Sequence, residues 1–201
     1  MGSFLGTLEK AAKFLSANMD RLADEDLMMR YSEGDVRAFD ILYQRHKDGL
    51  FRFISRQVGK EFVEELFQDV WSRLIKARSR YHVSAKFRTY LFTIAHRRVI
   101  DFYRQHSPIS LDSFEDVESL ISTDVTPDIS AHNAQIFQKL LQVVDQLPAA
   151  QREVFALKQE GFTVDEIAEM TATDYETVKS RVRYASNKVK QVLGRDYESN
   201  E

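Results

Sequence analysis

The sequence predicts an all-α protein made of two small helical domains joined by a flexible acidic linker. Only three prolines occur in 201 residues, and no glycine lies between Gly59 and Gly161, so the residues that punctuate β-strands are scarce. Apolar residues recur at the three- and four-residue spacing of amphipathic helices, as in Val63, Leu66 and Val70. Residues 107–130 interrupt this pattern with six acidic side chains and no Lys or Arg.

Each element follows from this spacing and from its end signals. The first domain, residues 24–106, is expected to hold helices at about 24–34, 35–58, 60–79 and 86–105. The second, residues 131–195, is expected to hold helices at about 131–146, 149–160, 164–170 and 175–193. Residues 1–23 form an N-terminal extension with helical spacing, and 196–201 form a tail. Gly49, inside the second helix, should weaken it by about 1 kcal/mol relative to Ala.

Charge is segregated along the chain, although the net charge is only −3. Residues 84–106 are strongly basic, and so are residues 176–195. The acidic linker separates them. Two basic segments of this kind indicate a nucleic-acid partner that the whole-chain charge would not suggest.

The second domain contains the signals of a helix-turn-helix. Thr163 and Glu166 have the spacing of a capping box, and Thr173 or Asp174 can cap the following helix. The turn places Ala172 where Gly is common, and a left-handed conformation there would cost about 1 kcal/mol. Ala168 and Val178 are suited to the helix crossing. The N-terminal part of the second helix would enter the major groove, where Arg pairs with guanine. Its exposed candidates for DNA binding are Thr177, Lys179, Ser180, Arg181 and Arg183.

The helix at 86–105 interleaves aromatic rings with cations. Such a mixture suits melted or single-stranded nucleic acid, because cations follow the phosphates and rings stack on bases. Most of the rings are nevertheless expected in the core, so the cations are the stronger candidates. These candidates are Lys86, Arg88, Arg97, Arg98 and Arg104.

The helix at 60–79 carries an acidic and apolar face that suits either a protein partner or solvent. Its candidates for protein binding are Glu65, Leu66, Gln68, Asp69 and Trp71.

An enzyme is not expected. Cysteine is absent, no phosphate-binding glycine loop occurs, and the five histidines lack metal-ligand spacing. We therefore expect no catalytic residue, no metal and no cofactor. The chain has no run of about 18 apolar residues and no signal peptide, which predicts a cytoplasmic protein without a membrane span.

Residues 25–193 resemble the extracytoplasmic-function (ECF) sigma factors, of the sigma-70 family of bacterial RNA polymerase initiation factors. In the first domain the resemblance lies in Gly34-Asp35, in residues 65–71, and in Phe87-Arg88-Thr89-Tyr90-Leu91. In the second domain it lies in Leu147-Pro148, in Arg152-Glu153-Val154-Phe155, in Glu166-Ile167-Ala168 and in residues 177–181. The order and spacing of these segments across both domains make the match specific.

The resemblance implies that residues 24–106 are sigma region 2 and residues 131–195 are sigma region 4. Region 2 would dock on the β′ subunit of core RNA polymerase through the 65–71 face, and its basic helix would melt and hold the −10 element. Region 4 would read the −35 element of promoter DNA and touch the β subunit. Many family members are held by an anti-sigma factor. The chain departs from the family at Arg97, Tyr90, Glu176 and Tyr184, so its promoter sequence cannot be taken from relatives.

An alternative is a stand-alone helix-turn-helix regulator that binds an operator as a dimer. Such a regulator would bind DNA without polymerase, and it would leave the acidic 65–71 face without a role.

Overall fold

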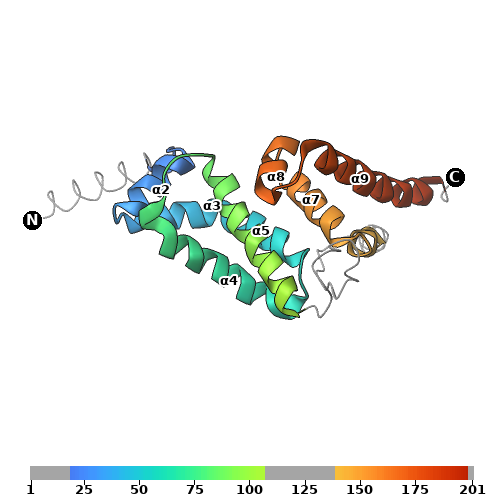
Figure 1. Ribbon diagram of the computed structural model, residues 1–201, viewed down its shortest axis with the longest axis horizontal. Helices are drawn as coiled ribbons and strands as arrows, with labels where there is room; N and C mark the ends of the chain where they lie inside the picture. The colour runs from blue at the N-terminus through green and yellow to red at the C-terminus, as the bar shows by residue number, and fades with distance from the viewer. Residues whose placement is uncertain (1–18, 107–138, 199–201) are drawn as a thin grey trace, which may run out of the picture.

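The computed structural model describes residues 19–106 and 139–198, with side chains described as far as residue 191. Every regular element in these ranges is helical, which confirms the predicted fold class (Figure 1). The predicted linker and the start of the helix expected at 131–146 lie outside the described residues, as do residues 1–18. Residues 139–145 are helical. The elements are α2 (Asp24–Ser32), α3 (Val36–Ser55), α4 (Lys60–Ala77), the 3-10 turn η1 (Arg78–Arg80), α5 (Phe87–His106), α7 (Ala149–Gln159), α8 (Val164–Thr171) and α9 (Tyr175–Glu198).

Helices α2 to α5 form one bundle, and its core follows the predicted spacing. Leu42, Leu50 and Phe53 lie on one stripe of α3 and are fully buried. The rings on α5 are mostly core as expected, with Phe87, Phe92 and Phe102 at most 6% exposed. The cations on this helix therefore remain the groups to consider for nucleic acid.

The end of α7 is fixed by a glycine turn. Gly161 has φ +89°, and its N–H donates to the Lys158 carbonyl at 3.0 Å. The Phe162 N–H donates back to the Leu157 carbonyl at 3.3 Å, which completes a Schellman motif. The turn directs the Phe162 ring against Phe92 of α5, with the ring centres 4.9 Å apart.

The two helical groups share one hydrophobic core. We expected each domain to bury its own apolar faces, but apolar residues of α7 and α8 belong to the same buried cluster as α2 to α5. Leu157, Phe162 and Ile167 are at most 2% exposed within it. Helix α8 lies beside α5, and α9 extends away from the bundle (Figure 1). A smaller cluster of Val144, Leu147, Phe155 and Ala185 holds α7 against α9.

None of the helices in the described ranges combines the length and apolarity that a bilayer span requires.

Candidate functional site

The helix-turn-helix forms with the predicted local chemistry. The Glu166 N–H donates to Thr163 Oγ1 at 3.2 Å, and the Thr163 N–H donates to Glu166 Oε2 at 2.9 Å, which is a complete capping box. Ala172 has φ 51° and ψ 38°, the left-handed conformation expected at the turn. Asp174 caps the next helix by accepting the Thr177 N–H at 2.8 Å. Val178 is fully buried at the helix crossing.

The N-terminal half of α9 presents a polar surface. Lys179, Ser180 and Arg183 are exposed, whereas Thr177 and Arg181 are half-buried. Lys179 Nζ lies 3.3 Å from Glu176 Oε1, one turn earlier on the exposed face. Because surface pairs of this kind contribute about 0–1 kcal/mol, Lys179 can exchange Glu176 for a phosphate at little cost.

A groove of about 490 Å³ lies between the start of α7 and this half of α9. It brings together three of the predicted DNA-binding residues, Thr177, Ser180 and Arg181, and leaves Lys179 and Arg183 outside its lining. Gln151 and Tyr184 also line it, and neither was predicted from the sequence to bind DNA. The position of Tyr184, one turn after Arg181 on the same helix, could have indicated that it lies on the same surface. Gln151 is on α7, so its place beside Arg181 could be found only from the fold.

The start of α5 is held by a side chain of α2. Glu25 Oε1 accepts the Phe87 N–H at 2.6 Å and so caps a helix 62 residues further along the chain. This contact fixes the position of Lys86 and Arg88. Both cations face α7 and α8: Lys86 Nζ lies 2.8 Å from Glu166 Oε1, and the Arg88 guanidinium lies over the Phe162 ring at 4.3 Å.

The other three cations of α5 fall into two classes. Arg97 and Arg104 are exposed. Arg98 is only 7% exposed, and its Nε donates to Asp69 Oδ2 at 2.6 Å. Arg98 therefore links α4 to α5, and its guanidinium is not free to bind a phosphate.

The predicted protein-binding residues of α4 are divided in the same way. Glu65 and Gln68 are exposed, with 69% of the Glu65 side chain accessible. Leu66 and Trp71 are buried, so they position the helix rather than meet a partner. Asp69 is half-buried between Arg98 and Arg73, and Arg73 Nε lies 3.0 Å from its carboxylate. The exposed part of this face therefore consists mainly of Glu65 and Gln68.

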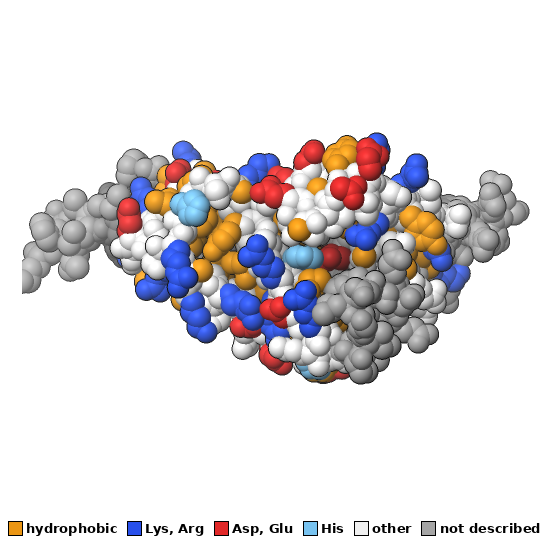
Figure 2. Space-filling model, in the orientation of Figure 1, with side chains coloured by type: hydrophobic (Ala, Val, Ile, Leu, Met, Phe, Trp, Pro, Cys, Tyr) orange, Lys and Arg blue, Asp and Glu red, His pale blue; other side chains and the backbone are white. Residues whose placement is uncertain are grey.

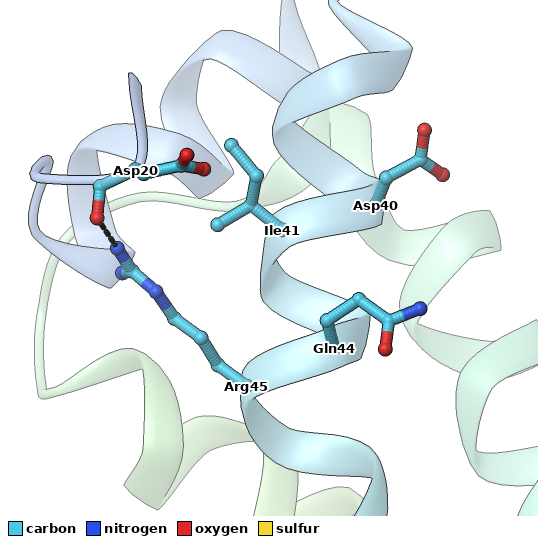
Figure 3. A pocket seen from close by; sticks show the side chains of 5 residues that line it. All are labelled: Asp20, Asp40, Ile41, Gln44 and Arg45. Atoms are coloured by element: carbon cyan, nitrogen blue, oxygen red, sulfur yellow. Dashed lines mark hydrogen bonds between the residues drawn. The ribbon is translucent and has the colours of Figure 1, made fainter. Parts of the chain in front are cut away.

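Another hollow, of about 370 Å³, lies between Asp20, before α2, and the first half of α3 (Figure 3). The Arg45 guanidinium turns toward the chain before α2 and donates to the Asp20 carbonyl at 2.6 Å, while Asp40 and Gln44 point away from it. Arg45 also pairs with Asp24. Its cation is therefore used to anchor α2. The described residues contain no group of His, Asp or Glu arranged to hold a metal ion.

Charged side chains are distributed unevenly over the surface. On the face seen in Figure 2, Lys and Arg gather over α4 and α5, and acidic side chains stand over α8. A basic surface on the first helical group thus lies next to an acidic one on the second.

Comparison with known proteins agrees with this organisation. The family model for Sigma-70 region 2 matches residues 42–109, and that for Sigma-70 region 4 matches residues 137–188. The ECF RNA polymerase sigma factor SigK of Mycobacterium sp. (strain KMS) is 29% identical over 178 residues, which cover 85% of this chain and 91% of SigK. The ECF RNA polymerase sigma-E factor of Escherichia coli (strain K12) is 26% identical over 190 residues, which cover 88% and 99%.

Solved structures share the fold. CnrH, in complex with the cytosolic domain of CnrY, aligns with a TM-score of 0.64 at 22% identity, covering 87% of this chain and 99% of CnrH. The sigma factor RpoE of Bartonella quintana, in complex with the anti-sigma factor NepR, aligns with a TM-score of 0.55 at 21% identity, covering 76% and 96%. The two family models together match more than half of the residues, in the expected order. The chain therefore belongs to the sigma-70 family of RNA polymerase sigma factors, as a member of the ECF type.

Proposed function

We propose that this sigma factor directs core RNA polymerase to promoters by reading the −35 element with region 4 and opening the −10 element with region 2. The observation that carries the proposal is the groove beside α9. Thr177, Ser180 and Arg181 line one side of this groove of the protein. They lie in the N-terminal half of α9, the second helix of the capped helix-turn-helix, and that part of a recognition helix enters the DNA major groove. Lys179 and Arg183 extend the same polar surface.

For the −10 element we propose that Arg97 and Arg104 contact DNA phosphates, because both side chains are exposed on α5. Lys86 and Arg88 are further candidates, although in the structure Lys86 pairs with Glu166 and Arg88 lies over Phe162. The RNA chemistry is left to the polymerase, and we place the protein in the cytoplasm with it. We propose residues 24–106 as region 2 and residues 131–195 as region 4, with the limits expected from the sequence.

For core polymerase we propose that the exposed Glu65 and Gln68 on α4 meet a basic surface of the β′ subunit. Region 4 would contact the β subunit, as the family resemblance implies. An anti-sigma factor is the proposed regulator, supported by the fold shared with the NepR-bound RpoE of Bartonella quintana.

The test of promoter reading is transcription by reconstituted holoenzyme on a promoter library, with the transcripts sequenced. Arg181→Ala should reduce −35-dependent initiation about fivefold or more, because one bidentate base contact is worth about 1–3 kcal/mol. Lys188→Ala, an exposed cation about two turns further along α9, is the matched control. Equal promoter output from Arg181→Ala and wild type would contradict the assignment.

The test of core binding is the affinity of the purified chain for core polymerase. Glu65→Gln, which removes the charge without placing a cation beside the buried Arg98, should weaken it, whereas Glu33→Gln, at an exposed carboxylate at the end of α2, should not. Asp69 is a poor probe, because its replacement leaves the buried Arg98 without its main partner. A stand-alone regulator predicts specific DNA binding in the absence of polymerase and no effect of Glu65→Gln.

A further inference from the structure

We propose that the groove between the start of α7 and α9 reads one A·T base pair of the −35 element, with Gln151 on the adenine and Tyr184 on the thymine. The inference rests on the proposed function and makes it more specific, because it gives a base preference to two residues that the sequence did not predict to bind DNA. Arg181 lies with them in the same groove of about 490 Å³.

The groove has a wall from each of two helices. The α9 residues that line it form one stripe of that helix, because they follow the first of them at three, four and seven residues. The third residue of α7, Gln151, faces this stripe, and two apolar residues lie beside it. The complete lining is Thr177, Ser180, Arg181 and Tyr184 from α9, with Pro148, Ala150 and Gln151 from the start of α7.

The polar side chains of the groove have unused hydrogen-bonding groups. In the part of the chain that the structure describes, neither the Arg181 guanidinium nor the Tyr184 hydroxyl makes a hydrogen bond or an ion pair. Gln151 Oε1 is buried and accepts no hydrogen bond from any described residue. A buried acceptor without a donor is unfavourable, and the terminal torsion of a glutamine turns readily. A ligand that offers an N–H group beside Gln151 is therefore stabilised in this groove.

The edge of an A·T base pair fits these groups. In the DNA major groove adenine offers the N7 acceptor and the N6 amino donor, which together match the amide of a glutamine. Thymine is the base that offers a methyl group, and the Tyr184 ring, 49% exposed, supplies an apolar surface for it. A G·C pair has no methyl group, and its guanine presents two acceptors, so Gln151 Oε1 would stay unpaired beside it.

The spacing along α9 suits two neighbouring base pairs. Arg181 and Tyr184 are three residues apart, or about 4.5 Å along the helix axis, which is close to the step of about 3.4 Å between base pairs. The Arg181 guanidinium matches N7 and O6 of guanine, so we expect a G·C pair beside the A·T pair. Tyr184 is a position at which the chain departs from the family, so this preference belongs to the chain itself.

The two contacts are tested with holoenzyme on synthetic copies of a promoter found by transcript sequencing. Deoxyuridine in place of thymidine removes only the C5-methyl group, and 7-deazaadenine replaces only the N7 acceptor by a C–H group. At one A·T pair of the −35 element, deoxyuridine should weaken promoter binding about three- to fivefold, the effect of exposing one methyl group. At the same pair, 7-deazaadenine should weaken it about two- to tenfold, the effect of one hydrogen bond.

Variants of the protein assign each effect to one side chain. Tyr184→Ala should abolish the effect of deoxyuridine, whereas Tyr184→Phe, which keeps the ring, should retain it. Gln151→Ala should abolish the effect of 7-deazaadenine. Gln159→Ala, at an exposed glutamine at the other end of α7, is the matched control and should respond to both analogues as the wild type does.

On a promoter whose output depends on its −35 sequence, the wild type alone can overturn the proposal, if no A·T pair there responds to both analogues. Analogue effects that persist at full size in Tyr184→Ala and Gln151→Ala would also overturn it. So would an equal loss of binding on every −35 sequence in these variants, because contacts to phosphates carry no sequence information. Failure of the proposed function has a different signature, since wild-type output would then ignore every base-pair replacement in the −35 element.

Discussion

Replacing Gly49 by Ala should have two opposite effects on the stability of the protein, one within α3 and one on its contact with Glu160. Alanine is about 1 kcal/mol better than glycine in a helix interior, so the change by itself should stabilise α3. The added Cβ would lie 2.9 Å from Glu160 Oε2, so the carboxylate must shift, and we expect the shift to strain its bidentate pairing with Arg52.

The loss of stability that this shift causes can be estimated from the two hydrogen bonds between Arg52 and Glu160. Hydrogen bonds to charged groups contribute about 1.5–3 kcal/mol each, and Arg52 makes two of them to Glu160, at 3.0 and 2.9 Å. More than half of the Arg52 side chain is exposed, so water weakens the pair, and we take a loss of about 1–2 kcal/mol. The net effect of Gly49→Ala on the free energy of unfolding should therefore lie between about zero and 1 kcal/mol of destabilisation.

The assay is a double-mutant cycle measured by urea denaturation of the full-length chain. In a Glu160→Ala background the obstruction is absent, and Gly49→Ala should then stabilise by the full value of about 1 kcal/mol. The coupling between the two positions should be about 1–2 kcal/mol. A stabilisation of about 1 kcal/mol in both backgrounds would refute the reasoning, because Gly49 would then have no connection to the docking of α7.

Three other predictions follow from single contacts. Ala172→Gly should stabilise the chain by about 0.5–1 kcal/mol in urea denaturation, since Gly adopts the left-handed conformation without strain; a loss of stability would contradict this. Glu25→Ala should lower the free energy of unfolding by about 1 kcal/mol, because it removes the cap on the Phe87 N–H, and amide exchange at the start of α5 should rise with it. Burial opposes the charge on His96, but the hydrogen bond and charge of Glu153 outweigh burial and the repulsion from Arg97 and raise its pKa above 6.5. The stabilisation from the charged pair should be complete below about pH 6.5 and be lost as the pH rises through that raised pKa; a free energy of unfolding that depends on pH equally in wild type and His96→Gln would contradict it.

The local chemistry of the helix-turn-helix was predictable from the sequence because it depends on residues close together in the chain. The capping box of Thr163 and Glu166 spans four residues, and the strained turn at Ala172 follows from its position between two helices. The helix bounds were also close to the expected ones, since few glycines and prolines leave few alternatives.

Side-chain partners between distant helices were not predictable. Arg98 looked like a DNA-binding cation in a basic run, but Asp69, 29 residues earlier, holds it between two helices. Whether a cation on α5 points to solvent or to α4 depends on the rotation of the packed helix, which composition does not determine. Glu160 was unremarkable in sequence, because its partner Arg52 is 108 residues away.

The position of Gly49 shows how a residue that looks unfavourable locally can be informative. A helix-weakening glycine in an otherwise regular amphipathic helix has a cost that neighbouring residues in α3 do not offset. The offset comes from Glu160 on another helical group, whose carboxylate occupies the vacant space. Without the packing of Glu160 against α3, a mutation of Gly49 to Ala would stabilise α3 at no steric cost. Glycine at this position is therefore explained by the Glu160 carboxylate packed against it, which belongs to the contact between the two helical groups.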